Sequence, residues 1–129
     1  MGNTEGKTGL VLEELTGRII AAAIEVHRQL GPGFLESIYE QALKIELTRR
    51  GITFEAQRPV EVAYAGEVVG NHVLDLIIKD KVVVELKAVK ELDDVHYAQL
   101  RSYLRATGAK VGLLMNFNSP MLVVKRVVN

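Results

Sequence analysis

The sequence contains no cysteine and no tryptophan. Without cysteine the chain has no disulfide framework, no thiolate zinc site and no cysteine nucleophile. Aromatic residues make up only 5% of the chain, which argues against an aromatic platform on which nucleic-acid bases stack. Several common binding and catalytic chemistries are therefore excluded at the outset.

Long apolar runs and an excess of one charge are also missing. No apolar stretch reaches the ~18 residues needed to span a bilayer, and no basic segment at the N-terminus leads into an apolar one. The 16 Lys and Arg residues are balanced by 16 Asp and Glu residues, unlike the basic footprint of a protein that coats nucleic acid. We therefore expect a cytoplasmic protein with no membrane partner.

The composition is that of an ordinary globular protein. A chain of 129 residues, 48% hydrophobic and 25% charged, fits a single folded domain. Gly2, Gly6 and Gly9 lie among polar residues near the N-terminus. The sequence therefore predicts a flexible N-terminus over residues 1–12 and one domain over residues 13–129.

Hydrophobic periodicity predicts an α/β fold. Apolar residues at three- and four-residue steps predict helices that end near Gly31, Gly51 and Thr107, the last of them beginning at Asp93 or Asp94. A period of two and β-branched residues predict strands over Val60–Tyr64, Val68–Ile78, Val82–Val89, Val111–Met115 and Leu122–Val128. Helix, helix, three strands, helix and returning strand make a mixed α+β sheet with helices packed on it.

Three ionisable residues interrupt two of these apolar strands. Because side chains alternate between the faces of a strand, Glu85 and Lys87 share one face, and Asp75 joins them only if the turn has the right length. A three-residue loop over residues 79–81 places Asp75 opposite Glu85, whereas a two-residue loop pairs it with Leu86 and breaks the cluster. The prediction of a site therefore depends on this turn.

Two interpretations of the cluster stay open at this point. Opposed carboxylates repel each other, and a divalent cation would relieve that repulsion; oxygen ligands without cysteine or clustered histidine favour Mg²⁺ or Mn²⁺. Alternatively, Asp75, Glu85 and Lys87 form a structural ion pair near the sheet edge.

Three motifs together give a family resemblance. Asp75 followed by Glu85-Leu86-Lys87 has the D…(D/E)-x-K pattern, with Leu74 where the pattern often has proline. Gly33 to Tyr39 reads G-x-x-E-x-x-Y, and Gln99 to Tyr103 reads Q-x-x-x-Y. The chain after residue 12 resembles the GxxExxY protein family, a small bacterial branch of the PD-(D/E)XK nuclease superfamily. The last motif is also similar to that of RecB-like exonuclease domains.

The resemblance implies a restriction-endonuclease-like core with an extra N-terminal helix. It also implies metal-dependent hydrolysis of phosphodiesters in nucleic acid, with DNA favoured over RNA. By resemblance the metal ligands are Asp75, Glu85, the backbone carbonyl of Leu86 and, through water, Glu36. Lys87 would position the attacking water or neutralise charge, while Gln99 and Tyr103 border the site.

Further expectations accompany this interpretation. The main alternative is a non-catalytic binding or scaffold module that keeps the nuclease fold, and a homo-oligomer or a partner protein is expected to supply substrate recognition. The histidines are too dispersed for a helical two-histidine metal motif, and alternation along its strand puts His72 on the face opposite to Asp75.

Overall fold

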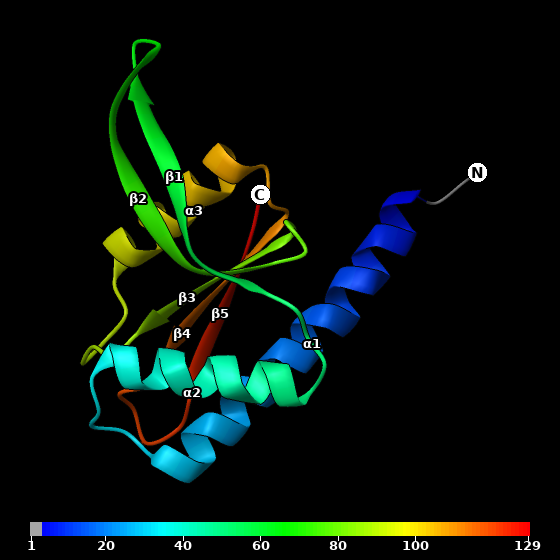
Figure 1. The fold of residues 1–129 in the computed structure, drawn as a ribbon, viewed down its shortest axis with the longest axis vertical. Coiled ribbons are helices and arrows are strands. Elements are labelled where there is room, and N and C mark those ends of the chain that lie inside the picture. The colour runs from blue at the N-terminus through cyan, green and yellow to red at the C-terminus, as the bar shows by residue number, and fades with distance from the viewer. Residues whose placement is uncertain (1–3) are drawn as a thin grey trace.

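The structure of the protein is a computed structural model that describes residues 4–129 (Figure 1). The elements follow one another along the chain as α1 (Thr4–Leu30), α2 (Glu36–Arg49), β1 (Glu55–Tyr64), β2 (Glu67–Ile78), β3 (Val82–Lys87), α3 (Asp94–Thr107), β4 (Val111–Asn116) and β5 (Val123–Val128). The predicted order of elements is confirmed, including the edge strand at the C-terminal end.

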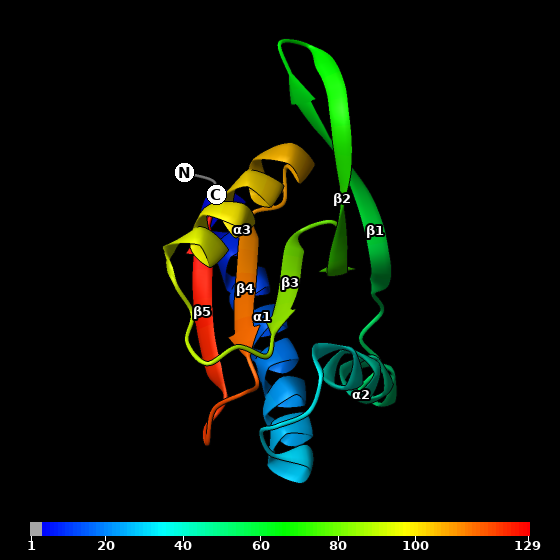
Figure 2. The ribbon, with the colours of Figure 1, turned by 90° about the vertical axis from the view of Figure 1, so that its left-hand side faces the viewer.

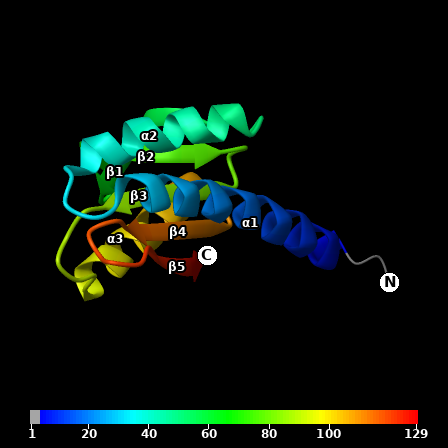
Figure 3. The same cartoon turned by 90° about the horizontal axis from the view of Figure 1, so that it is seen from below.

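The five strands form one mixed sheet in the order β1-β2-β3-β4-β5. Strands β3 and β4 pair in parallel, and every other neighbouring pair is antiparallel. Helix α3 provides the crossover between the two parallel strands, as such a connection requires. Helices α1 and α2 lie side by side on one side of the sheet (Figure 3), and α3 packs on the other. The predicted α/β class with a mixed sheet is therefore correct.

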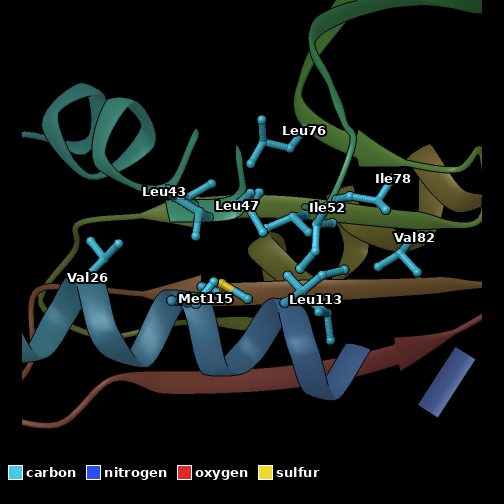
Figure 4. Close-up of a cluster of buried hydrophobic side chains, with 14 of the residues drawn as sticks. Val26, Leu43, Leu47, Ile52, Leu76, Ile78, Val82, Leu113 and Met115 are labelled. Atoms are coloured by element: carbon cyan, nitrogen blue, oxygen red, sulfur yellow. The ribbon is translucent and has the colours of Figure 1, made fainter. Parts of the chain in front are cut away.

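Alternating side chains of the central strands fill two cores. Leu76, Val82 and Val84 face α1 and α2, where Leu43 and Leu47 of α2 meet them (Figure 4). The side chains of opposite parity face α3, where they pack against its buried leucines. They belong to Ile77, Val83 and Leu114. Because β3 and β4 are covered on both faces, all their residues except Lys87 are buried.

Two elements begin earlier than their sequence patterns suggest. Helix α1 reaches back to Thr4, so most of the segment predicted to be flexible is helical, and residues 1–3 of that segment lie outside the described residues. Strand β1 begins at Glu55 rather than Val60. Pro59 masks this start, because proline disfavours a strand, but β1 is an edge strand, where proline is tolerated.

The β1–β2 hairpin extends beyond the rest of the sheet as an arm (Figure 2). Ala65 and Gly66 at its tip both have positive φ angles, as a tight two-residue hairpin turn requires. Apolar side chains are exposed on the arm, Tyr64 most of all, at 77%.

None of the helices within residues 4–129 is long and apolar enough to cross a membrane.

The ends of α3 are fixed by its flanking residues. Asp93 caps the first turn by accepting a hydrogen bond from the Val95 amide at 3.0 Å, and His96 completes a capping box by accepting from the Asp93 amide. Gly108 ends the helix in the left-handed conformation (φ 75°). The predicted start and end of this helix are both confirmed, and they set the position of Gln99 and Tyr103 over the sheet.

Candidate functional site

The turn between β2 and β3 has the length that brings the acidic residues together. Ile78 pairs with Val82, which leaves residues 79–81 as a three-residue loop. The antiparallel ladder then continues to the pair Leu76 and Val84. Asp75 and Glu85 are the next residues on the two strands, and both line the same cavity, so the three-residue turn on which the predicted cluster depends is present.

Beyond the pair Leu76 and Val84, hydrogen bonds to carboxylates join β2 and β3 in place of backbone–backbone hydrogen bonds. The Leu86 amide donates to Oδ2 of Asp75 at 2.9 Å, and the Asp75 amide donates to Oε2 of Glu85 at 3.3 Å. Each strand is thus held to the other by an acidic side chain where a backbone–backbone pair would otherwise lie. The two carboxylates form part of the sheet as well as part of the site.

The six side chains predicted for the site all line one cavity. It has a volume of about 90 Å³, room for a few water molecules. Its walls come from α2, β2, β3, α3 and β4 and comprise Glu36, His72, Val73, Asp75, Glu85, Lys87, His96, Gln99, Leu100, Tyr103 and Leu114. Leu86, predicted to contribute its carbonyl, keeps its side chain in the opposite core and gives its amide to Asp75.

Lys87 occupies the end of β3, where the backbone is held firmly. Its carbonyl accepts from the Phe117 amide at 2.9 Å. The buried Asn116 beside it accepts from the Val89 amide at 3.1 Å and donates to the Val89 carbonyl at 2.9 Å. The chain that leaves the site is therefore held to β4, which fixes the backbone of Lys87 beside the cavity.

Carboxyl groups are crowded together in and beside this cavity. Burial raises the pKa of Glu85 to about 9, and the adjacent Asp75 adds to the shift. Desolvation, followed by repulsion from Asp75, also raises the pKa values of Glu36 and Glu40, and the charge of Lys87 opposes the shifts of Glu36 and Glu85. Lys87 alone does not balance the charge that these carboxyl groups would carry if all were ionised.

Carboxylate oxygens with little positive charge nearby suit a hard divalent cation. No three His, Asp or Glu side chains within residues 12–129 are arranged to hold one ion. Mg²⁺, however, is commonly held by one or two carboxylates together with water and substrate phosphate. Asp75 and Glu85 provide such a pair, so the residues present fit the group that the resemblance implies.

Glu36 is placed in the site by the firmly held loop that precedes α2. It is the first residue of that helix, where the helix dipole favours a carboxylate. Tyr39, three residues later, is fully buried; its hydroxyl donates to the Gly31 carbonyl at 2.6 Å and accepts from the Phe34 amide at 3.1 Å. Its ring stacks on Phe117 at 4.7 Å. The tyrosine of the G-x-x-E-x-x-Y motif is thus a packing residue that fixes the loop before Glu36.

Removal of the Tyr39 hydroxyl should therefore destabilise the fold. We expect Tyr39→Phe to lower the free energy of unfolding by about 1–3 kcal/mol, because the Phe34 amide and the Gly31 carbonyl lose a buried partner. Urea denaturation measures this loss. Tyr64→Phe is the matched control, since Tyr64 is exposed; equal losses for the two variants would contradict this role of Tyr39.

A second acidic residue of α2 was missed by the sequence patterns. Glu40 is only 9% exposed and accepts from Nε2 of Gln57 with both carboxylate oxygens, at 2.9 and 3.0 Å. Gln57 has a φ angle of 54° and interrupts the β1–β2 ladder opposite Asp75. Glu40 follows Glu36 by one helical turn, so a search for acidic residues at that spacing would have found it.

The exclusion of His72 from the site is corrected by the structure. His72 lines the cavity, and its Nε2 lies 3.3 Å from Oε1 of Glu85. Simple alternation fails near Asp75, which has no ladder partner on either neighbouring strand. Leu74 shows the same change, since it packs with Ile77 on the α3 side rather than with Leu76.

Comparisons with known proteins support the fold and the superfamily. In a search of solved structures, the chain is similar to the crystal structure of SSO0001, with a TM-score of 0.58 and 23% sequence identity over 72% of this chain. The chain spans about half of that protein (49%), and at this identity the likeness concerns the fold alone. No curated protein matches the sequence. The sequence profile of the PD-(D/E)XK nuclease superfamily matches residues 13–127, nearly the whole chain, and the protein therefore belongs to this superfamily.

Proposed function

We propose that this protein is a divalent-metal-dependent nuclease of the GxxExxY branch of the superfamily, acting on nucleic acid and on DNA in preference to RNA. One observation carries the proposal: Glu36, Asp75, Glu85 and Lys87 line a single small cavity. The two motif residues of α3, Gln99 and Tyr103, line it as well. Nucleases of this superfamily generally use divalent metals, and the surplus of carboxylates here accords with that chemistry.

The residues divide into those that hold the ion and those that act on the substrate. Asp75, Glu85 and the carbonyl of Leu86 would hold Mg²⁺ or Mn²⁺, and Glu36 would reach it through water. When bound, a divalent ion activates water and stabilises negative charge on the scissile phosphate. The carboxylates would keep the ion beside the phosphodiester.

Lys87 is the cationic side chain of the cavity and is assigned to the attacking water. As an ammonium group it orients that water and offsets charge that develops on the phosphate; as the neutral amine it would take the proton of the water. Gln99 and Tyr103 lie one turn apart on α3 and so project together toward the cavity. They are assigned to the substrate phosphate.

The alternative function, a non-catalytic binding or scaffold module, is favoured by one specific observation. Asp75 and Glu85 already accept hydrogen bonds from backbone amides across the strands. A purely structural use of the two carboxylates would produce the same contacts. The predicted association into a homo-oligomer or with a partner protein, and the predicted cytoplasmic location, stay predictions under either function.

A cleavage assay separates the two functions. Purified protein is incubated with single- and double-stranded DNA and RNA in Mg²⁺ or Mn²⁺, and in EDTA. We expect cleavage, strongest on DNA, that EDTA abolishes. Failure to cleave any of the four substrates, combined with failure to bind Mn²⁺, would support the scaffold function and overturn the proposal.

A further inference from the structure

Tyr103, His72 and Glu85 form a continuous chain of contacts that the assigned chemistry does not use. The rings of Tyr103 and His72 stack with their centroids 3.9 Å apart and their planes 11° from parallel. The Tyr103 hydroxyl lies 3.1 Å from Nδ1 of His72, and Nε2 of the same ring lies 3.3 Å from Oε1 of Glu85. Both nitrogens of the imidazole are thus engaged, one toward each neighbour.

The two oxygens of Glu85 have separate partners. Oε1 faces His72, and Oε2 accepts from the Asp75 amide, each at 3.3 Å. Glu85 is only 6% exposed, so water does not readily replace a lost partner. A neutral imidazole whose Nδ1 accepts from the Tyr103 hydroxyl carries its hydrogen on Nε2, the nitrogen that faces Glu85. His72 is therefore placed to donate to the carboxylate and fix its rotation.

We propose that His72, held by Tyr103, is a positioning residue that orients Glu85 for metal binding. The inference rests on the proposed function, since Glu85 acts as a ligand only if the protein binds a divalent ion. His72 belongs to the β1–β2 arm, where it pairs with Val60, so the arm supplies the outer partner of a carboxylate on β3. Tyr103, the tyrosine of the Q-x-x-x-Y motif, then contributes to the site in two ways. It holds His72, and it lines the cavity itself.

Partners that orient a metal ligand typically change metal affinity by 10- to 100-fold when they are removed. We expect His72→Phe to weaken Mn²⁺ binding by about this factor, because phenylalanine keeps a ring against Tyr103 and has no nitrogen to donate. His72→Gln should recover most of the affinity, because its amide nitrogen can reach the position of Nε2.

Mn²⁺ binding is measured without substrate, from the electron paramagnetic resonance signal of the free ion at one fixed pH. Asn71→Ala is the matched control, since Asn71 is the exposed neighbour of His72 on β2, and it should bind Mn²⁺ as the wild type does. Thermal unfolding in EDTA monitors the folding of each variant.

The outcomes separate this inference from the proposed function. Equal affinity in wild type and His72→Phe overturns the positioning role, as does a His72→Gln variant that binds no better than His72→Phe. A wild-type protein that binds no Mn²⁺ overturns the proposed function itself. Weak binding by His72→Phe, recovery by His72→Gln and an unchanged Asn71→Ala control support both.

Discussion

Lys87→Ala should lower the rate of DNA cleavage by about 10²- to 10⁴-fold. The side chain lies in the cavity with Asp75 and Glu85, and its charge opposes the raised pKa of Glu85. Its removal takes away the group assigned to the attacking water and to the charge on the phosphate. Single-turnover cleavage at saturating Mn²⁺ measures the loss in the chemical step.

Lys81→Ala is the matched control for this variant. Lys81 immediately precedes β3, whereas Lys87 ends that strand, so the two lysines lie at opposite ends of one element. Lys81 is exposed, and its replacement should leave the cleavage rate within a few-fold of the wild type. Cleavage that survives Lys87→Ala at the wild-type rate would eliminate the assigned mechanism even if the protein proves to be a nuclease.

Glu85→Gln should stabilise the metal-free protein at pH 8 relative to the wild type. The pKa of Glu85 is raised from 4.5 to about 9 in the folded state, so the folded chain binds this proton more tightly than the unfolded chain does. The contribution of the carboxyl to stability is therefore complete below pH 4.5 and is lost as the pH rises toward 9. Glutamine keeps the acceptor for the Asp75 amide and has no proton to lose.

Thermal unfolding in EDTA between pH 7 and 9 measures this effect. The range avoids the titration of His72, whose pKa is lowered from 6.5 by burial. The wild-type melting temperature should fall across the range, that of Glu85→Gln should fall less, and Mn²⁺ should raise the wild-type value. Glu67→Gln, at an exposed position of β2, should follow the wild type. A wild-type protein with no pH dependence above pH 7 would contradict the raised pKa.

Much of the fold and of the site could be predicted from local sequence signals. Capping residues and a terminal glycine mark α3 accurately, and alternation along β3 places Glu85 and Lys87 on the same face. The turn over residues 79–81 was the uncertain step, because turns of two and three residues look alike in sequence. The observed pairing of Ile78 with Val82 resolves it in favour of the site.

The remainder depends on tertiary geometry that no periodicity reports. His72 reaches the cavity because β2 departs from regular alternation at Asp75, and this departure arises where carboxylates replace backbone partners. Gln57 adopts a positive φ angle, an uncommon conformation for a non-glycine residue, and presents its amide to Glu40. Both contacts join residues on separate elements, so neither has a signal within a single stretch of sequence.

The double use of Asp75 and Glu85 bears on how this lineage would change if turnover were no longer selected. Each residue supplies an acceptor that joins β2 to β3, so a descendant without enzymatic activity would still tend to keep acidic or amide side chains there. Persistence of the carboxylate pair therefore records selection for a folded sheet as much as for chemistry. Lys87 supplies no such link between strands, and relaxed selection would show first as drift at that position.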